Sequence, residues 1–219
     1  MPIDKSTFTF LRTLKKNNNR DWFQENKKKY QAAHENMLQF TDEVLKAYGK
    51  VEDLQPQEPK KALFRIYRDV RFSKNKDPYK TNFAMHIRTQ PKRLGLYVHV
   101  EPGGNSIVAT GIWQPSPAQL KAVRQEIDYN ADALRKILKR KKFVDTFGEL
   151  QGDELKTAPK GYDVENPNID LIRKKQWMAW ASFKDADVTA PDFVKTVVNT
   201  AKTAKDFQAF FNAPLSEVD

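Results

Sequence analysis

Apolar residues near the start of the chain recur at three- and four-residue steps, the spacing of an amphipathic helix. They predict a short helix from about Thr7 to Lys15. Asn17 and its neighbours then break it, because asparagine favours turns and helix N-caps. A longer helix is expected from about Arg20 to Tyr48. The residues of its apolar stripe are Phe23, Tyr30, Ala33, Met37, Phe40, Val44 and Tyr48.

The middle of the chain changes to the two-residue alternation of β-strands. The expected strands are Phe64–Phe72, Phe83–Thr89, Leu94–Glu101 and Ser106–Trp113. Residues 90–93 are expected to close a hairpin between the second and third of these strands, and the Gly103-Gly104-Asn105 sequence marks the next turn. Strands that follow one another through short turns favour an antiparallel sheet.

Helical and loop patterns alternate in the rest of the chain. Ser116 and Gln119 have the spacing of a capping box, and helices are expected through about Asp128 and from Ala131 to Lys141. A loop-rich segment, a strand and a C-terminal helix follow, at 151–170, Gln176–Phe183 and Pro191–Phe211. The pattern predicts a single α+β domain over residues 1–219. Its single antiparallel sheet has about five strands, packed by helices on one side.

Composition narrows the possible chemistry. The chain has no cysteine, which excludes disulfides, thiolate metal sites and a cysteine nucleophile. With only three histidines, the sequence offers no metal-ligating set, and it leaves the cofactor and any metal dependence unknown. It contains neither a signal-peptide-like apolar core nor a membrane-length apolar run, so a soluble, cytoplasmic protein without membrane contact is expected. The net charge of +10 favours anionic partners.

The positive charge is densest between Arg65 and Asn82, where the sequence reads RIYRDVRFSKNKDPYKTN. Arginine binds phosphate and carboxylate groups with two parallel hydrogen bonds, and a neighbouring carboxylate such as Asp69 can orient it. We therefore expect this block to bind an anion. The candidate ligand-binding residues are Arg65, Arg68, Arg71, Lys76, Tyr79, Lys80 and Asn82.

Strand parity predicts a polar face beside this block. One face of the first hairpin strand carries the apolar residues Phe83, Met85 and Ile87, and one face of the second carries Leu96, Val98 and Val100. The other face of the first strand then carries His86 and Arg88. The other face of the second strand carries Tyr97, His99 and Glu101. The hairpin would place His86 opposite His99. Arg65, Tyr67, Asp69 and Arg71 would join this face if they form a strand, and Arg68, on the apolar parity, then indicates a bulge or a buried charge paired with a carboxylate.

This polar face has two interpretations. It is a binding face, in which Asp69, His86 and His99 are candidate catalytic groups and the histidines could exchange protons near neutral pH. Alternatively, it is the water-exposed side of an antiparallel sheet, where such side chains simply make cross-strand pairs.

The basic block also carries a family resemblance. It resembles the hallmark of the proteins grouped as domain of unknown function 2461, which is R-x-x-R-D-x-R-F followed by [DN]-K-x-P-Y-K-x-N. The residues that fill this pattern are Arg65, Arg68, Asp69, Arg71, Phe72, Asn75, Lys76, Pro78, Tyr79, Lys80 and Asn82. The resemblance spans nearly the whole chain. It implies that the arginine block is a shared feature of the family, and it implies no particular ligand.

Three functions remain open on the sequence. The leading hypothesis is a protein that binds a small phosphorylated or carboxylated molecule at the basic block, either as a binding protein or as an enzyme acting on that molecule. The second is a nucleic-acid-binding module that uses the basic surface. The third is a protein-interaction adaptor, which exposed aromatic residues around Trp177 and Trp180 would favour.

Overall fold

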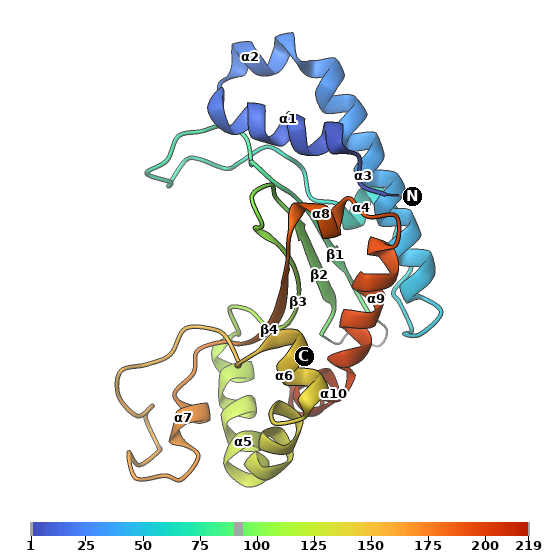
Figure 1. Cartoon of the computed structure of the whole chain (residues 1–219). Coiled ribbons are helices and arrows are strands. Elements are labelled where there is room, and N and C mark those ends of the chain that lie inside the picture. The colour runs from blue at the N-terminus through green and yellow to red at the C-terminus, as the bar shows by residue number, and fades with distance from the viewer. Residues whose placement is uncertain (1, 90–93, 219) are drawn as a thin grey trace. The chain divides into compact units, whose positions relative to one another are not determined.

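The computed structural model describes residues 2–89 and 94–218. Its strands form one four-stranded antiparallel sheet in the order β1-β2-β3-β4, and ten helices accompany them in the described part of the chain (Figure 1). The predicted α+β class is confirmed, with four strands instead of about five. No helix among the described residues is long and apolar enough to cross a membrane.

The described chain falls into two compact units, and neither is a continuous stretch of sequence. The first comprises the residues up to Ile87 together with Tyr97–Val108 and Ser182–Asn199. The second comprises Arg88–Leu96, Ala109–Ala181 and the residues from Thr200 onward. Each is described by itself below. The single domain over 1–219 stays a prediction, and the hairpin residues 90–93 lie outside the described part.

The first unit contains the N-terminal helices. The predicted long helix is split at Asn26, which has the non-helical φ of −102° and ψ of 16°. Asn19 caps the first of the two parts, since its side chain accepts a hydrogen bond from Trp22 N at 2.9 Å. The helices that belong to this unit in whole or part are α1 (Lys5–Lys16), α2 (Arg20–Glu25), α3 (Lys27–Tyr48), α4 (Pro59–Ala62), α8 (Asp185–Val188) and α9 (Phe193–Thr203).

A buried amide ties the chain start to α3. The Oδ1 atom of Asn36 accepts hydrogen bonds from Asp4 N and Thr7 Oγ1, both at 2.9 Å. Apolar side chains from α1 and α3 fill the space around it and are fully buried, among them Phe8, Leu11, Leu14, Met37, Phe40 and Val44. This packing places α1 against α3.

The strands are β1 (Phe83–Ile87), β2 (Leu96–Val100), β3 (Ser106–Ile112) and β4 (Trp177–Phe183). The expected apolar faces of β1 and β2 are confirmed, because Phe83, Met85, Ile87, Leu96, Val98 and Val100 are all buried. The predicted strand Phe64–Phe72 is wrong. Within that segment only Tyr67 makes an isolated bridge, to Tyr79, and Leu63 just before it bridges to Met85. Phe72, on the expected apolar face, is 96% exposed.

The second unit contains α5 (Pro117–Leu138), α6 (Lys141–Phe147), α7 (Ile169–Ile172) and α10 (Lys205–Leu215). The predicted capping box at Ser116 is present, and the predicted break between two helices is a kink in α5 at Asn130, where φ is −133°. The expected C-terminal helix is divided near Ala204 into α9 and α10.

Trp177 is an interior residue of the second unit. Its side chain is fully buried, and its indole N–H donates to Leu171 O at 3.1 Å. Trp180 is half-buried. Neither is a large exposed aromatic residue, so the feature that would have favoured an adaptor at this place is missing.

Candidate functional site

Residues 64–82, called the basic loop below, form an irregular two-armed excursion between α4 and β1, drawn in cyan to teal in Figure 1. Backbone hydrogen bonds hold the arms together. Arg68 N donates to Pro78 O at 2.9 Å, and Lys80 N donates to Ile66 O at 2.8 Å. Because the arms pair with each other in this way, the loop is ordered although it lacks a regular strand.

Tyr79 anchors the basic loop to the helices. Its ring lies parallel to that of Phe23, with centroids 3.9 Å apart and an interplanar angle of 11°. The side chain of Asn18 binds both backbone groups of Tyr79, accepting from its N at 3.1 Å and donating to its O at 2.9 Å. Tyr79 is 4% exposed. We therefore assign it to packing and not to ligand contact.

Arg68 and Lys76 hold the outer part of the loop together. The guanidinium of Arg68 donates to Asp77 O at 3.1 Å and to Ser73 Oγ at 3.3 Å, and Lys76 Nζ donates to Val70 O at 3.0 Å. Arg68 thus binds neutral oxygens in an irregular loop, and neither the expected bulge nor a carboxylate partner for Arg68 is present among the described residues. These contacts give both cations a role in loop structure.

Asp69 orients Arg71, two residues away. Arg71 Nε donates to Asp69 Oδ1 at 3.0 Å and Arg71 NH2 donates to Asp69 Oδ2 at 2.7 Å, which is the two-pronged arrangement of guanidinium and carboxylate. The hydrogen bonds from the Arg71 side chain lower the pKa of Asp69. Both side chains are exposed, so the pair itself adds little to stability.

Arg65 and Lys80 differ from these cations, because the side chain of neither forms a hydrogen bond or an ion pair with any described residue. Lys80 Nζ lies 5.5 Å from the centre of the Phe64 ring, a cation–π contact. Burial lowers the pKa of Lys80, and the positive charge of Arg65 lowers it further. The two positive charges repel each other, and Asp69, whose charge interacts with that of Arg65, is itself hydrogen-bonded to Arg71.

A hydrogen-bonded chain of polar side chains runs along β2 and its C-terminal end. Tyr97 Oη and Asn82 Nδ2 lie 3.1 and 3.3 Å from His99 Nδ1, and His99 Nε2 lies 3.0 Å from Glu101 Oε2. The side chains of His99 and Glu101 are 20% and 19% exposed. Burial raises the pKa of Tyr97, and the charge of Glu101 adds to this effect. The predicted alternation thus does bring Tyr97, His99 and Glu101 together.

Phe64 connects this chain to the two unpaired cations. Its ring centre lies 6.4 Å from that of Tyr97, and Lys80 lies over the same ring. Asn82, at the end of the basic loop, contacts His99 directly. The candidate site therefore consists of Arg65, Lys80, Asn82, Tyr97 and His99, with Glu101 behind the histidine.

Glu101 is fixed from several sides. Thr81 Oγ1 donates to Glu101 Oε1 at 3.3 Å, and Lys15 Nζ lies 3.6 Å from the same oxygen. The backbone of Glu101 also binds the side chain of Ser106, with N donating to Oγ at 3.0 Å. These contacts hold the carboxylate that orients His99.

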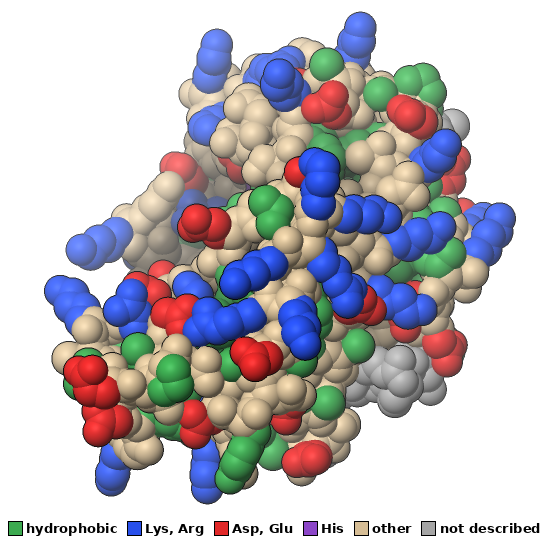
Figure 2. All heavy atoms as spheres, turned by 60° about the horizontal axis from the view of Figure 1, so that its bottom comes forward, with side chains coloured by type: hydrophobic (Ala, Val, Ile, Leu, Met, Phe, Trp, Pro, Cys, Tyr) green, Lys and Arg blue, Asp and Glu red, His purple; other side chains and the backbone are tan. Residues whose placement is uncertain are grey.

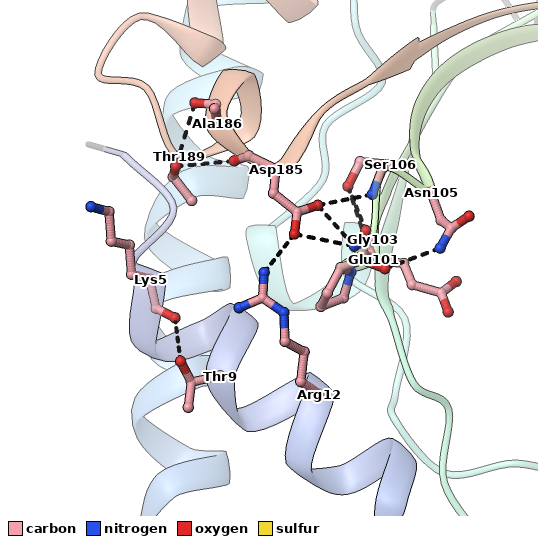
Figure 3. Close-up of polar contacts among 12 residues, drawn as sticks. Lys5, Thr9, Arg12, Glu101, Gly103, Asn105, Ser106, Asp185, Ala186 and Thr189 are labelled. Carbon is pink, nitrogen blue, oxygen red and sulfur yellow. Dashed lines mark hydrogen bonds and ion pairs between the residues drawn. The ribbon is translucent and has the colours of Figure 1, made fainter.

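The turn after Glu101 is latched by Asp185 (Figure 3). The Asp185 carboxylate accepts from Gly103 N at 2.9 Å and Gly104 N at 3.0 Å, and Arg12 NH2 donates to it at 2.6 Å. The two glycines have φ values of 92° and 75°, which only glycine adopts readily. Sequence analysis missed Arg12 and Asp185, since no local pattern links either residue to this turn.

The remaining residues of the predicted polar face are Tyr67, His86 and Arg88. Tyr67 contacts the rings of Tyr79 and Phe23, with centroids 5.4 and 6.1 Å apart, and is 50% exposed. His86 is exposed on β1, and Arg88 is exposed in the second unit. The described residues contain no cluster of three or more histidine, aspartate or glutamate side chains placed to hold a metal ion.

The surface charge is mixed in sign. Figure 2 shows one face of the molecule, on which many Lys and Arg side chains have Asp and Glu side chains among them. On this face the net charge of +10 is not gathered into one uninterrupted basic patch. Specific sites such as the pair Arg65 and Lys80 are therefore more informative about a ligand than the total charge.

Comparison with known proteins gives one match. A protein-family model described as "Conserved hypothetical protein (DUF2461)" matches residues 6–210. No curated protein and no solved structure matches the chain. The matched range includes the whole basic loop and the polar chain on β2.

Proposed function

The chain belongs to the DUF2461 family of conserved hypothetical proteins, and from this premise we propose that it binds a small phosphorylated or carboxylated molecule at Arg65 and Lys80. The observation that carries the proposal is the position of these two cations. Their positive charges act on each other, and neither side chain forms a hydrogen bond or an ion pair with a described residue. An anion placed between them would relieve their mutual repulsion. An isolated surface lysine has no such repulsion to relieve, so it gains less from binding an anion.

The two side chains would divide the recognition. Arg65 can donate two parallel hydrogen bonds to a phosphate or carboxylate, whereas Lys80 acts as a compact charge. Lys80 is half-buried beside the Phe64 ring, so its attraction for an anion is screened less by salt than that of a fully exposed lysine. Phe64 and Tyr97 supply apolar surface for the rest of the ligand.

The polar chain behind this pair supports an enzymatic form of the proposal. If His99 Nε2 carries its proton toward Glu101, His99 Nδ1 can accept one from Tyr97 Oη. A ligand group that contacts Tyr97 could then exchange a proton with the protein through its hydroxyl. In this scheme Glu101 orients His99, and Tyr97 is the group that touches the ligand.

Thermal unfolding in the presence of pyrophosphate, citrate, sugar phosphates and nucleotides tests the proposal. A ligand at about 100 times its Kd adds about 2.7 kcal/mol to the free energy of unfolding, which for a chain of this size raises Tm by roughly 5 to 10 °C. We expect such a shift in the wild type and its loss in Arg65→Gln and Lys80→Gln. Lys74→Gln removes a charge from the outer part of the basic loop and should keep the shift.

Two results would overturn this assignment. One is the absence of any shift across the panel, and the other is an equal loss of shift in Lys74→Gln and Lys80→Gln, which would indicate attraction by total charge alone. A cytoplasmic location is part of the same proposal, and fractionation of cells that express the tagged full chain checks it.

A further inference from the structure

Phe72 is the most exposed large apolar side chain among the described residues, at 96%. A phenylalanine gains roughly 1.5 to 3 kcal/mol when it is transferred from water into an apolar contact, and this gain is not used within the chain. Single exposed apolar residues are common on protein surfaces. Phe72 differs from those because the loop around it is held by hydrogen bonds between its own residues.

Internal hydrogen bonds fix the backbone on both sides of Phe72. Ser73 N donates to Val70 O at 3.3 Å, and Asn75 Oδ1 accepts from Asp77 N at 2.8 Å. Arg68 and Lys76 add their contacts to the same stretch. A ring displayed in this way loses little conformational freedom on binding, which favours affinity.

In residues 68–77 the cations Arg68, Arg71, Lys74 and Lys76 outnumber the two carboxylates, Asp69 and Asp77. The guanidinium carbon of Arg71, which is paired with Asp69, lies 5.8 Å from the centre of the Phe72 ring. Lys74 is exposed and makes no ion pair or hydrogen bond to any described residue. The cations Arg68 and Lys76 bind only neutral oxygens, so their charges are not cancelled by a carboxylate. The tip of the loop therefore offers a flat apolar ring next to several positive charges.

We propose that the tip of the basic loop binds single-stranded nucleic acid, with a base stacked on Phe72 and phosphates beside Arg71 and Lys74. This partner carries flat rings and anions in alternation. The loop also carries aromatic rings and cations in alternation, since Phe64 and Tyr67 are 42% and 50% exposed and Arg65 and Arg68 follow each of them in the sequence. A lipid surface would contact only the tip of the loop around Phe72, and not the aromatic and basic residues further along it. Stacking on aromatic side chains and a cationic track are the two elements of strand binding without sequence preference.

Fluorescence anisotropy with a labelled oligo-uridine strand of about 20 nucleotides, at about 150 mM salt, tests this site. Loss of one base–aromatic contact corresponds to roughly 5- to 150-fold in affinity, so Phe72→Ala should raise Kd by a factor in that range. Phe72→Tyr keeps a stacking ring and should bind like the wild type. Tyr129→Ala is the matched control, because Tyr129 is 83% exposed but lies on α5.

Salt dependence supplies a second readout. Removing one phosphate contact in Lys74→Gln should lower the slope of log K against log salt by about 0.7. The proposal is overturned if the wild type does not bind the strand, if Phe72→Ala binds as well as the wild type, or if Tyr129→Ala loses as much affinity. Vesicles rich in anionic lipid are a parallel arm. Phe72-dependent binding to these vesicles, without binding to oligo-uridine, would overturn it in favour of a lipid surface.

This site is separable from the small-anion site. Phe72→Ala should keep the thermal shift with the small anions of the panel, and Lys80→Gln should keep the contribution of Phe72 to strand binding. Either proposal can therefore fail while the other stands.

Discussion

The aromatic ring of Tyr79 lies flat against that of Phe23, with centroids 3.9 Å apart. Tyr79 belongs to the basic loop and Phe23 to α2, so this stack joins the candidate site to the N-terminal helices. The arms of the loop are fixed at their base by this contact and by the side chain of Asn18. The positions of Arg65 and Lys80, one on each arm, depend on it.

Tyr79→Ala is therefore expected to destabilise the protein. Removal of a large buried aromatic side chain leaves a cavity and typically costs about 3 to 5 kcal/mol in the free energy of unfolding. Urea denaturation measures this loss. Tyr67→Ala is the comparison, since Tyr67 touches the same rings but is 50% exposed, and it should cost much less. Equal losses in the two variants would show that Tyr79 is not the anchor.

Asp185 should stabilise the turn at Gly103 and Gly104. Hydrogen bonds to a charged group contribute roughly 1.5 to 3 kcal/mol, and Asp185→Ala removes several at once, so we expect a loss of about that size in the free energy of unfolding. Arg12→Ala removes only the exposed ion pair and should cost less than about 1 kcal/mol. If Arg12→Ala lowers the free energy of unfolding as much as Asp185→Ala does, the ion pair stabilises the turn and the hydrogen bonds to the backbone do not.

The same carboxylate predicts a pH dependence. Burial alone would raise the pKa of Asp185, but the hydrogen bonds from Gly104, Arg12 and Gly103 together lower it below the ordinary 3.8. A carboxyl whose pKa is lower in the folded state contributes stability fully above the unfolded pKa and loses it as the pH falls through the folded pKa. The stability difference between wild type and Asp185→Ala should therefore shrink below about pH 3.8. A difference that stays constant to pH 2 in urea titrations would contradict this assignment.

Gly111 in β3 should not tolerate a side chain. Its φ is 134°, and a Cβ atom built there would lie 2.2 Å from Trp177 O. Gly111→Ala is expected to cost about 3 kcal/mol or more, because a backbone clash is added to an unfavourable φ. Gly104 has a φ of 75° but open space around it, so Gly104→Ala is expected to lower the free energy of unfolding by only about 1 to 2 kcal/mol. Similar Tm values for the two variants would contradict the close approach of the Trp177 backbone to Gly111.

Arg68→Ala should loosen the outer part of the basic loop without unfolding the protein. The hydrogen bonds to Asp77 O and Ser73 Oγ are lost, and the arms then open more often. Amide exchange at Arg68 and Lys80, whose N–H groups join the two arms, should become faster. Arg71→Ala is the control, because the hydrogen bonds of the Arg71 side chain go to Asp69, two residues away, and do not join the two arms. Amide exchange at Arg68 and Lys80 should change little in this variant.

The sequence predicts the regular elements well, because each has a repeated local signal. The apolar alternation of β1 and β2 and the capping box of α5 are both seen. The apolar alternation from Phe64 to Phe72 does not indicate a strand, since the apolar side chains of this loop lie in different environments. Ile66 is buried, Phe64 is half-exposed and Phe72 is in water. Local periodicity does not distinguish such a loop from an edge strand.

The candidate site is only partly accessible to sequence reasoning. Strand parity correctly places Tyr97, His99 and Glu101 on one face. It does not reveal that the side chains of Arg68 and Lys76 form hydrogen bonds inside the loop, whereas those of Arg65 and Lys80 form none with any described residue. All four belong to one basic run in the sequence, and only the folded contacts separate structural cations from available ones.

The most direct test of the small-anion site is the pKa of Lys80, measured by NMR of its Cε and Hε nuclei with and without pyrophosphate, with Lys80→Gln to assign the signal. Without ligand, burial and Arg65 should hold this pKa below the ordinary 10.5. Pyrophosphate bound between the two cations favours the charged ammonium and should raise the pKa. A Lys80 pKa that stays the same at saturating pyrophosphate, in a sample where binding is detected by other signals, would show that the anion binds elsewhere.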